Sequence, residues 1–226
     1  MARLAAIAGV KRFVFLSSIK VNGEETAPGR PFTAQDGPAP ADLYGGSKWE
    51  AEQALRALAD ATGLELVIVR PSLVYGPGVG GNFAQMVRWV ARGIPLPLGA
   101  VHNKRTLMAL PNLVDLIKTA LSSAGAANQT LLAGDGEDFS TPQLLSAIGR
   151  ALGRPARLLP VPPPLLAAAA ALLGKRDMAR KLLGSLQLDL SQTRARLDWS
   201  PPVKAEQALR EAVRSLRDER AMAQQA

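Results

Sequence analysis

Short apolar runs alternate with helical patterns along this sequence, and this alternation constrains the fold more than any other feature. The runs FVFLSS (13–18), LELVIVR (64–70) and QTLLAG (129–134) predict buried strands. Between the first two lies a strong helical pattern over 44–62, which Gly63 ends. Strands that alternate with helices in this way favour an α/β domain with a parallel sheet.

Outside these segments, the sequence predicts mostly helices toward the C-terminal end of the chain. A Gly-, Pro-, Asp- and Thr-rich stretch over 22–42 predicts a long loop. Asn112 and Ser140 are candidate N-caps of the helices that follow them. Further helices are predicted at 2–9, 82–92, 112–124, 140–153, 164–174, 177–184 and 203–223, and extended segments at 106–110 and 156–162.

Composition excludes several classes of site. The sequence has no cysteine and one histidine, His102, which excludes disulfides, cysteine nucleophiles and histidine-rich metal sites. The net charge of +8 indicates an anionic partner, such as a nucleic acid, an acidic membrane surface or a phosphorylated small molecule. Because the basic residues are dispersed and nucleic-acid-binding motifs are absent, we interpret the charge as a soluble basic surface and expect no nucleic-acid partner. Because cysteine is absent and there is one histidine, we also expect no metal.

The most membrane-like stretch is LLAAAAALLG (165–174), followed by Lys175 and Arg176. It is about half as long as the roughly 20 residues that a membrane-spanning helix needs. We therefore expect a buried or packed helix here and no membrane span. The first residues, MARLAAIAG, lack the features of a signal peptide, which favours a cytoplasmic protein.

The sequence YGGSK places Tyr44 and Lys48 four residues apart in a predicted helix, and therefore on one face of it. A nearby ammonium favours the phenolate form of a tyrosine. Such a tyrosine can accept a proton from a sugar hydroxyl while hydride leaves the same carbon. The spacing alone is weak evidence, but Ser18 at the end of an apolar strand precedes Tyr44, and an Arg-Pro strand followed by VYGPG comes after it.

Six segments stand in one order and are spread over most of the length of the chain: VKRFVFLSS (10–18), YGGSKWEAE (44–52), VRPSLVYGPG (69–78), NF (82–83), KRTLMALPNLVDLI (104–117) and LDWSPP (197–202). In residues, order and spacing they resemble the extended short-chain dehydrogenase/reductases, specifically the NAD-dependent epimerase/dehydratase group. The resemblance implies that residues 1–153 form the C-terminal part of a Rossmann-like parallel sheet, with substrate-lobe insertions near 76–110. Residues 154–226 would form a smaller, mostly helical substrate-binding lobe.

The resemblance also implies roles for the catalytic residues. Ser18 would hydrogen-bond the reacting sugar oxygen, and Tyr44 would be the general acid and base. Lys48 would bind the nicotinamide ribose hydroxyls and favour the phenolate of Tyr44. Ser17 would belong to the cofactor-binding residues, together with Tyr44 and Lys48.

Other segments would bind the remaining parts of cofactor and substrate. The backbone around Pro71, Leu73 and Val74 would hold the carboxamide end of NAD. Asn82 would contact the substrate diphosphate, although it could also serve as a helix N-cap. Arg105 would pair with a diphosphate oxygen, which suits guanidinium geometry, although it could also be a surface arginine.

The chain departs from the family at three positions. The family often has Asn where Leu73 stands and Tyr where Asn22 stands, which leaves the identity of the sugar open. Lys20 is an unusual charge so close to Ser18, and it points either to solvent or to substrate. The acidic Asp115 reads as a structural residue.

The implied function is NAD-dependent epimerisation at C4 of a UDP-hexose or UDP-N-acetylhexosamine in surface-polysaccharide synthesis. One alternative is an NAD(P)-dependent 4-ketoreductase of a UDP-keto-sugar. Another is a non-catalytic remnant or binding module. The sequence holds no strand-GxxGxxG-helix unit for pyrophosphate. We therefore expect this chain alone to bind NAD weakly or not at all. The expected partner is either a second copy in a homodimer or a missing N-terminal half, supplied in cis or in trans.

Overall fold

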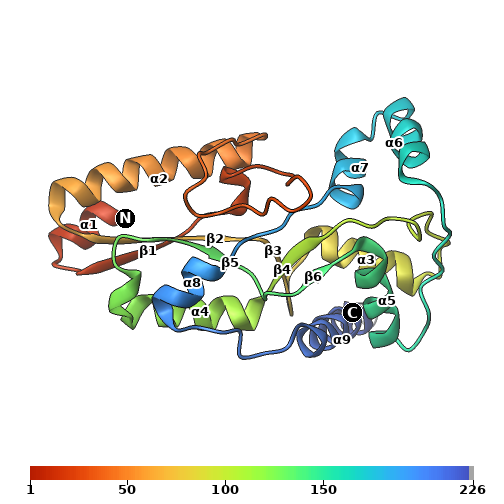
Figure 1. The fold of residues 1–226 in the computed structure, drawn as a ribbon. Coiled ribbons are helices and arrows are strands. Elements are labelled where there is room, and N and C mark those ends of the chain that lie inside the picture. The colour runs from red at the N-terminus through yellow and green to blue at the C-terminus, as the bar shows by residue number, and fades with distance from the viewer. Residues whose placement is uncertain (224–226) are drawn as a thin grey trace.

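The computed structural model describes residues 1–223, and the side chains of residues 1–218 (Figure 1). The strands are β1 Arg12–Leu16, β2 Glu65–Pro71, β3 Leu73–Tyr75, β4 Arg105–Ala109, β5 Thr130–Ala133 and β6 Asp138–Phe139. The α-helices are α1 Ala2–Ile7, α2 Leu43–Thr62, α3 Gly81–Ala91, α4 Leu110–Ser122, α5 Thr141–Ala151, α6 Pro163–Leu172, α7 Arg176–Leu183, α8 Ser191–Leu197 and α9 Ala205–Ala223. Short 3₁₀ turns lie at η1 Ile19–Val21 and η2 Ala124–Ala126.

The three apolar runs of the sequence form one parallel sheet in the order β1-β2-β5. Val14 is in register with Val67, and Val69 is in register with Leu131. The predicted α/β class with a parallel sheet is therefore confirmed. In a parallel sheet all carboxyl ends of the strands meet at one edge, so the residues that follow β1 and β2 come together there.

The central strand β2 is covered on both faces. Its alternate residues Leu66 and Ile68 pack in one cluster with Leu55 and Ala59 of α2. The intervening Val67 and Val69 pack on the opposite side, in a cluster that includes Leu113 and Leu116 of α4. Burial of both faces explains why this strand reads as a continuous apolar run rather than as an alternating one.

A second small sheet follows in the order β3-β4-β6, with β3 and β4 parallel and β4 and β6 antiparallel. The largest hydrophobic core lies here, where Phe83 of α3, Ile148 of α5 and Leu209 of α9 pack with Leu107 of β4. Helices on both sides of residue 153 share this core. The proposed domain division at 153/154 stays a prediction.

Most helices begin and end where the sequence predicts them. Ser140 caps α5 in a capping box with Gln143, as predicted. The predicted cap at Asn112 is wrong, because α4 begins at Leu110 after Ala109. The side chain of Asn112 is buried instead and donates to Asp135 Oδ1 at 2.8 Å. The short helix α8 was not predicted, because its sequence shows no clear helical pattern.

The Ala- and Leu-rich stretch forms α6, and of the two expected placements, buried or packed, the structure shows the packed one, with Leu166 against the main core. None of its residues is buried. Figure 1 shows α6 and α7 as a peripheral pair at one end of the molecule. Within residues 1–223, no helix is both long and apolar enough to cross a membrane.

Candidate active site

Tyr44 and Lys48 lie one turn apart at the start of α2. Asp42 is the N-cap of this helix, and its side chain accepts a hydrogen bond from the Gly45 backbone N–H at 2.7 Å. The Tyr44 ring is half exposed, and Lys48 Nζ lies 5.9 Å from its centroid. The helix therefore brings the phenol and the ammonium together as the spacing predicts.

Ser18 follows the carboxyl end of β1. Its Oγ accepts a hydrogen bond from the Lys20 backbone N–H at 3.3 Å, at the start of η1. Lys48 Nζ donates to the Leu16 carbonyl at 3.0 Å, which ties α2 to the end of the same strand. A lysine ammonium has three donors, so two remain for a ligand.

A buried polar network lies directly beneath these residues. Glu52, two turns after Tyr44 on α2, accepts two hydrogen bonds from the Arg70 guanidinium at 2.9 and 2.5 Å. Ser17 Oγ donates to the same carboxylate at 2.5 Å. Arg70 also donates to Asn22 Oδ1 at 2.9 Å. Asn22 thus serves the scaffold rather than a ligand, and the network fixes α2, β1 and β2 relative to one another.

All nine predicted site residues line one cavity of about 520 Å³, a size typical of ligand pockets. They are Ser17, Ser18, Tyr44, Lys48, Pro71, Leu73, Val74, Asn82 and Arg105. Ser72, between Pro71 and Leu73, lines the cavity too. Its buried Oγ has no hydrogen-bond partner among the described residues. A buried hydroxyl without a partner is costly, so it marks a place where a ligand can supply one.

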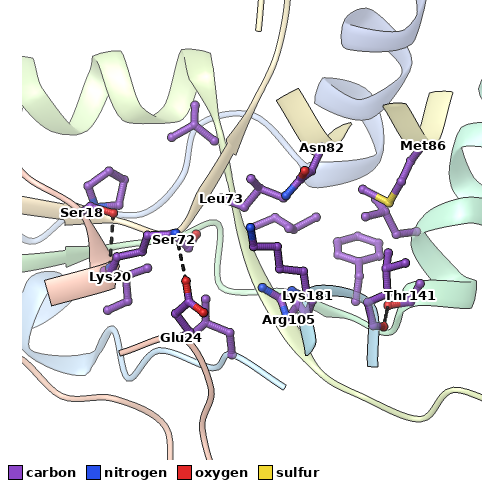
Figure 2. A pocket seen from close by; sticks show the side chains of 18 of the residues that line it. Ser18, Lys20, Glu24, Ser72, Leu73, Asn82, Met86, Arg105, Thr141 and Lys181 are labelled. Carbon is purple, nitrogen blue, oxygen red and sulfur yellow. Dashed lines mark hydrogen bonds and ion pairs between the residues drawn. The ribbon is translucent and has the colours of Figure 1, made fainter. Parts of the chain in front are cut away.

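Basic and amide side chains line the other part of the cavity, as Figure 2 shows. Arg105, in the first position of β4, donates through Nη1 to the Gly184 carbonyl at 3.0 Å. Burial lowers the pKa of Arg105 from its ordinary value, while the charges of Glu25 and Glu24 oppose this shift. Asn82 stands inside α3, whose N-cap is Gly80, so the reading of Asn82 as an N-cap is wrong.

Lys20 also lines the cavity, and it is held by two carboxylates. Its Nζ pairs with Glu24 at 3.0 Å and with Asp42. Burial by itself lowers the pKa of Lys20, but the hydrogen bonds to Asp42 and Glu24 outweigh it and raise the pKa above its ordinary value. The unusual charge beside Ser18 is thus part of the cavity wall.

Sequence reasoning missed the cavity residues that come from distant segments. Lys181 and Met178 belong to α7, and Thr141 belongs to the start of α5. Lys181 points toward the same space as Arg105 in Figure 2. No local motif surrounds these residues, so their place in the cavity could be identified only from the tertiary structure.

The other polar candidates lie elsewhere. His102 is exposed and is not among the residues that line the cavity. Asp115 Oδ2 accepts a hydrogen bond from Trp199 Nε1 at 2.9 Å, in agreement with its predicted structural role. Among the described side chains, no group of three His, Cys, Asp or Glu residues could hold a metal ion.

Comparison with known proteins identifies the family. The sequence model described as the NAD dependent epimerase/dehydratase family matches residues 1–134. The chain belongs to this family. It is 46% identical over 216 residues to the UDP-glucose 4-epimerase of Vibrio cholerae, a match that covers 95% of this chain and 66% of the relative.

Two further comparisons support the assignment. The chain is 30% identical to an N-acetyl-alpha-D-glucosaminyl-diphospho-ditrans,octacis-undecaprenol 4-epimerase of Escherichia coli O157:H7, covering 68% of this chain and 47% of the relative. The fold matches the crystal structure of UDP-glucose 4-epimerase with UDP-glucose from Thermotoga maritima at a TM-score of 0.74 and 22% identity, covering 96% of this chain and 67% of that one. The chain thus spans between about half and two thirds of the length of these relatives.

Proposed function

We propose that this chain provides the sugar-side part of an NAD-dependent C4 epimerase of a UDP-hexose or UDP-N-acetylhexosamine. The observation that carries the proposal is the convergence of Ser18, Tyr44 and Lys48 on one cavity, with Arg105 and Asn82 in the same wall. The phenol and hydroxyl suit a sugar C–OH group. The guanidinium and the amide suit the diphosphate that follows it.

The residues of this part of the cavity fit the nicotinamide end of NAD. The unpartnered Ser72 Oγ lies beside Pro71, Leu73 and Val74, where a carboxamide could supply its missing hydrogen bond. Lys48 keeps two N–H groups for ribose hydroxyls after its bond to Leu16. When bound, NAD supplies the acceptor for the hydride that leaves C4.

The chain's own residues would then move the proton. Tyr44 takes the proton of the C4 hydroxyl, and Ser18 holds the same oxygen as it becomes a carbonyl. The ammonium of Lys48 lies 5.9 Å from the Tyr44 ring centroid, next to the phenol that moves the proton. After the 4-keto sugar rotates in the cavity, the same hydride would return to the opposite face of C4, and Tyr44 would give the proton back to the C4 oxygen.

The substrates named for the two relatives differ in the group that is attached to the sugar. The name of the Vibrio relative specifies UDP, and that of the Escherichia relative specifies an undecaprenyl diphosphate. Both carriers place a diphosphate next to the sugar, so Arg105 would serve either one. We take the UDP-sugar as the substrate because the match to the Vibrio relative is longer and more similar.

A 4-ketoreductase of a UDP-keto-sugar is the second candidate. A dTDP-4-dehydro-6-deoxyglucose reductase of Escherichia coli is 24% identical over 216 residues, and a reductase can use the same serine, tyrosine and lysine. A non-catalytic binding module is the third reading. The presence of Ser18, Tyr44 and Lys48 in one cavity argues against this third reading.

Incubation of the full-length protein with UDP-GlcNAc or UDP-glucose and catalytic NAD tests the proposal, with NMR detection of the C4 epimer. Formation of UDP-GalNAc or UDP-galactose without net change in NADH supports an epimerase. Stoichiometric consumption of NADH or NADPH with a 4-keto sugar, and no epimerisation, would instead identify a reductase. No reaction in either assay would favour the non-catalytic reading.

A further inference from the structure

Helix α6 exposes an apolar surface that the candidate active site does not use. Every residue from Val161 to Leu173 is apolar. Leu165 is 62% exposed, Leu172 is 89% exposed and Leu173 is 70% exposed. A helix that is apolar all round belongs in a core or in lipid, and this one does not lie in the core. An exposed apolar surface of this kind is typical of an interaction site.

The inner side of α6 packs loosely on the body of the molecule. Leu166 and Ala170 line an apolar hollow of about 230 Å³ together with Trp89 and Leu98. Met178 and Leu182 of α7 line both this hollow and the candidate active site. The exposed helix is therefore next to the cavity that would hold the sugar diphosphate.

The charge around α6 has one dominant sign. Residues 154–188 contain six basic residues and one acidic residue, Asp177, but Arg180 pairs with Glu24 and Lys181 lines the candidate active site. Lys175 and Arg176 follow α6 directly, and both are exposed. Neither forms an ion pair with another side chain in the described part of the protein. An apolar helix with free cations at its end complements an anionic, lipid surface.

We propose that the α6–α7 pair docks on the surface of an anionic lipid bilayer. Ten helical residues extend over about 15 Å, so α6 would lie in the interface and would not span it. The outer side of α6 is aliphatic and has no Tyr, Trp or Arg, which are the residues that dominate the energy of protein–protein contacts. Aliphatic side chains next to Lys175 and Arg176 suit acyl chains below phosphate head groups.

Cosedimentation of the full chain with vesicles tests this proposal. Vesicles of phosphatidylcholine with phosphatidylglycerol should pellet the protein, and vesicles of phosphatidylcholine alone should do so much less. The double variant Leu165→Glu/Leu172→Glu should weaken partitioning at least about tenfold. Lys175→Ala/Arg176→Ala should weaken it roughly fivefold for each cation, on the anionic vesicles only. Leu121→Glu, at an exposed leucine of α4, is the matched control and should bind like the unmodified chain.

Two outcomes would overturn the proposal. One is a chain that stays in the supernatant with both kinds of vesicle. The other is a Leu165→Glu/Leu172→Glu variant that pellets as well as the control. If light scattering shows instead that this variant changes a dimer into a monomer, a second copy of the chain covers α6. Because the assay needs no turnover, its result is independent of the proposed epimerase activity.

Discussion

The carboxylate of Glu52 and the guanidinium of Arg70 form a bidentate ion pair that is almost completely inaccessible to solvent. Their side chains are 0% and 4% exposed, respectively. Glu52 stands two turns after Tyr44 on α2, and Arg70 directly precedes Pro71 at the end of β2. The pair therefore holds the helix that carries Tyr44 and Lys48 against the strand end that carries the predicted nicotinamide contacts.

Replacement of Glu52 by Ala should destabilise the protein strongly, because Arg70 would remain as a buried charge without its partner. We expect a loss of about 3–5 kcal/mol in the free energy of unfolding, measured with denaturant. The exposed pair Glu206 and Arg210 is the control, and Glu206→Ala should change stability by less than about 0.5 kcal/mol. Equal effects of the two substitutions would show that the buried pair does not hold the site together.

Replacement of Tyr44 by Phe should abolish proton transfer while the fold persists, because the Tyr44 side chain is 53% exposed. We expect turnover of a UDP-sugar by the full-length protein to fall about 10²–10⁴-fold. The melting temperature should stay unchanged. His102→Ala is the control and should keep full activity, because His102 does not line the cavity. A Tyr44→Phe enzyme that works normally would remove Tyr44 from the mechanism.

Replacement of Arg105 should affect binding of the diphosphate more than the chemical step. Arg105→Ala should raise KM for the UDP-sugar by about tenfold or more, since a charge-assisted hydrogen bond is lost. Arg105→Lys should recover only a part of this loss, because lysine cannot form a bidentate pair. An unchanged KM for both variants, measured in initial-rate assays, would mean that Arg105 serves only its bond to Gly184.

The Asp42–Lys20 pair predicts a dependence of stability on pH. The hydrogen bond from Lys20 lowers the pKa of Asp42 in the folded state. This stabilisation is therefore complete above the unfolded pKa, near 3.9, and is lost as the pH falls through the lower folded value. The raised pKa of Lys20 affects stability at the alkaline end of the pH range. Its contribution is complete below about pH 10.4 and is lost as the pH rises through the folded value.

A variant isolates this effect from helix capping. Asn is also a good N-cap, so Asp42→Asn keeps the cap of α2 and removes only the charge. At neutral pH the variant should be less stable by up to about 1 kcal/mol, because the pair is partly exposed. The difference should vanish in acid, below the folded pKa of Asp42. Urea titrations at several pH values measure it, and a constant difference at all pH values would contradict the account.

The sequence was sufficient to predict that the residues at strand ends and helix starts come together in one cavity. Ser18, Tyr44 and Pro71 each stand within or beside a strong local pattern, and a parallel sheet brings such positions to one edge. Lys181 and Thr141 could not be predicted, because they reach the cavity through long-range packing and no motif marks them. Local pattern also favours burial of an Ala- and Leu-rich helix, so the exposure of α6 could be found only from the structure.

The most direct test of the central claim follows the hydrogen at C4. Full-length protein, NAD and a UDP-sugar deuterated at C4 are incubated together in ordinary water, and the product is examined by NMR and mass spectrometry. The account predicts a C4 epimer that retains its deuterium, because hydride leaves and returns to the same carbon while Tyr44 moves only the hydroxyl proton. A product that has lost its deuterium to solvent, or no epimer at all, would contradict the account.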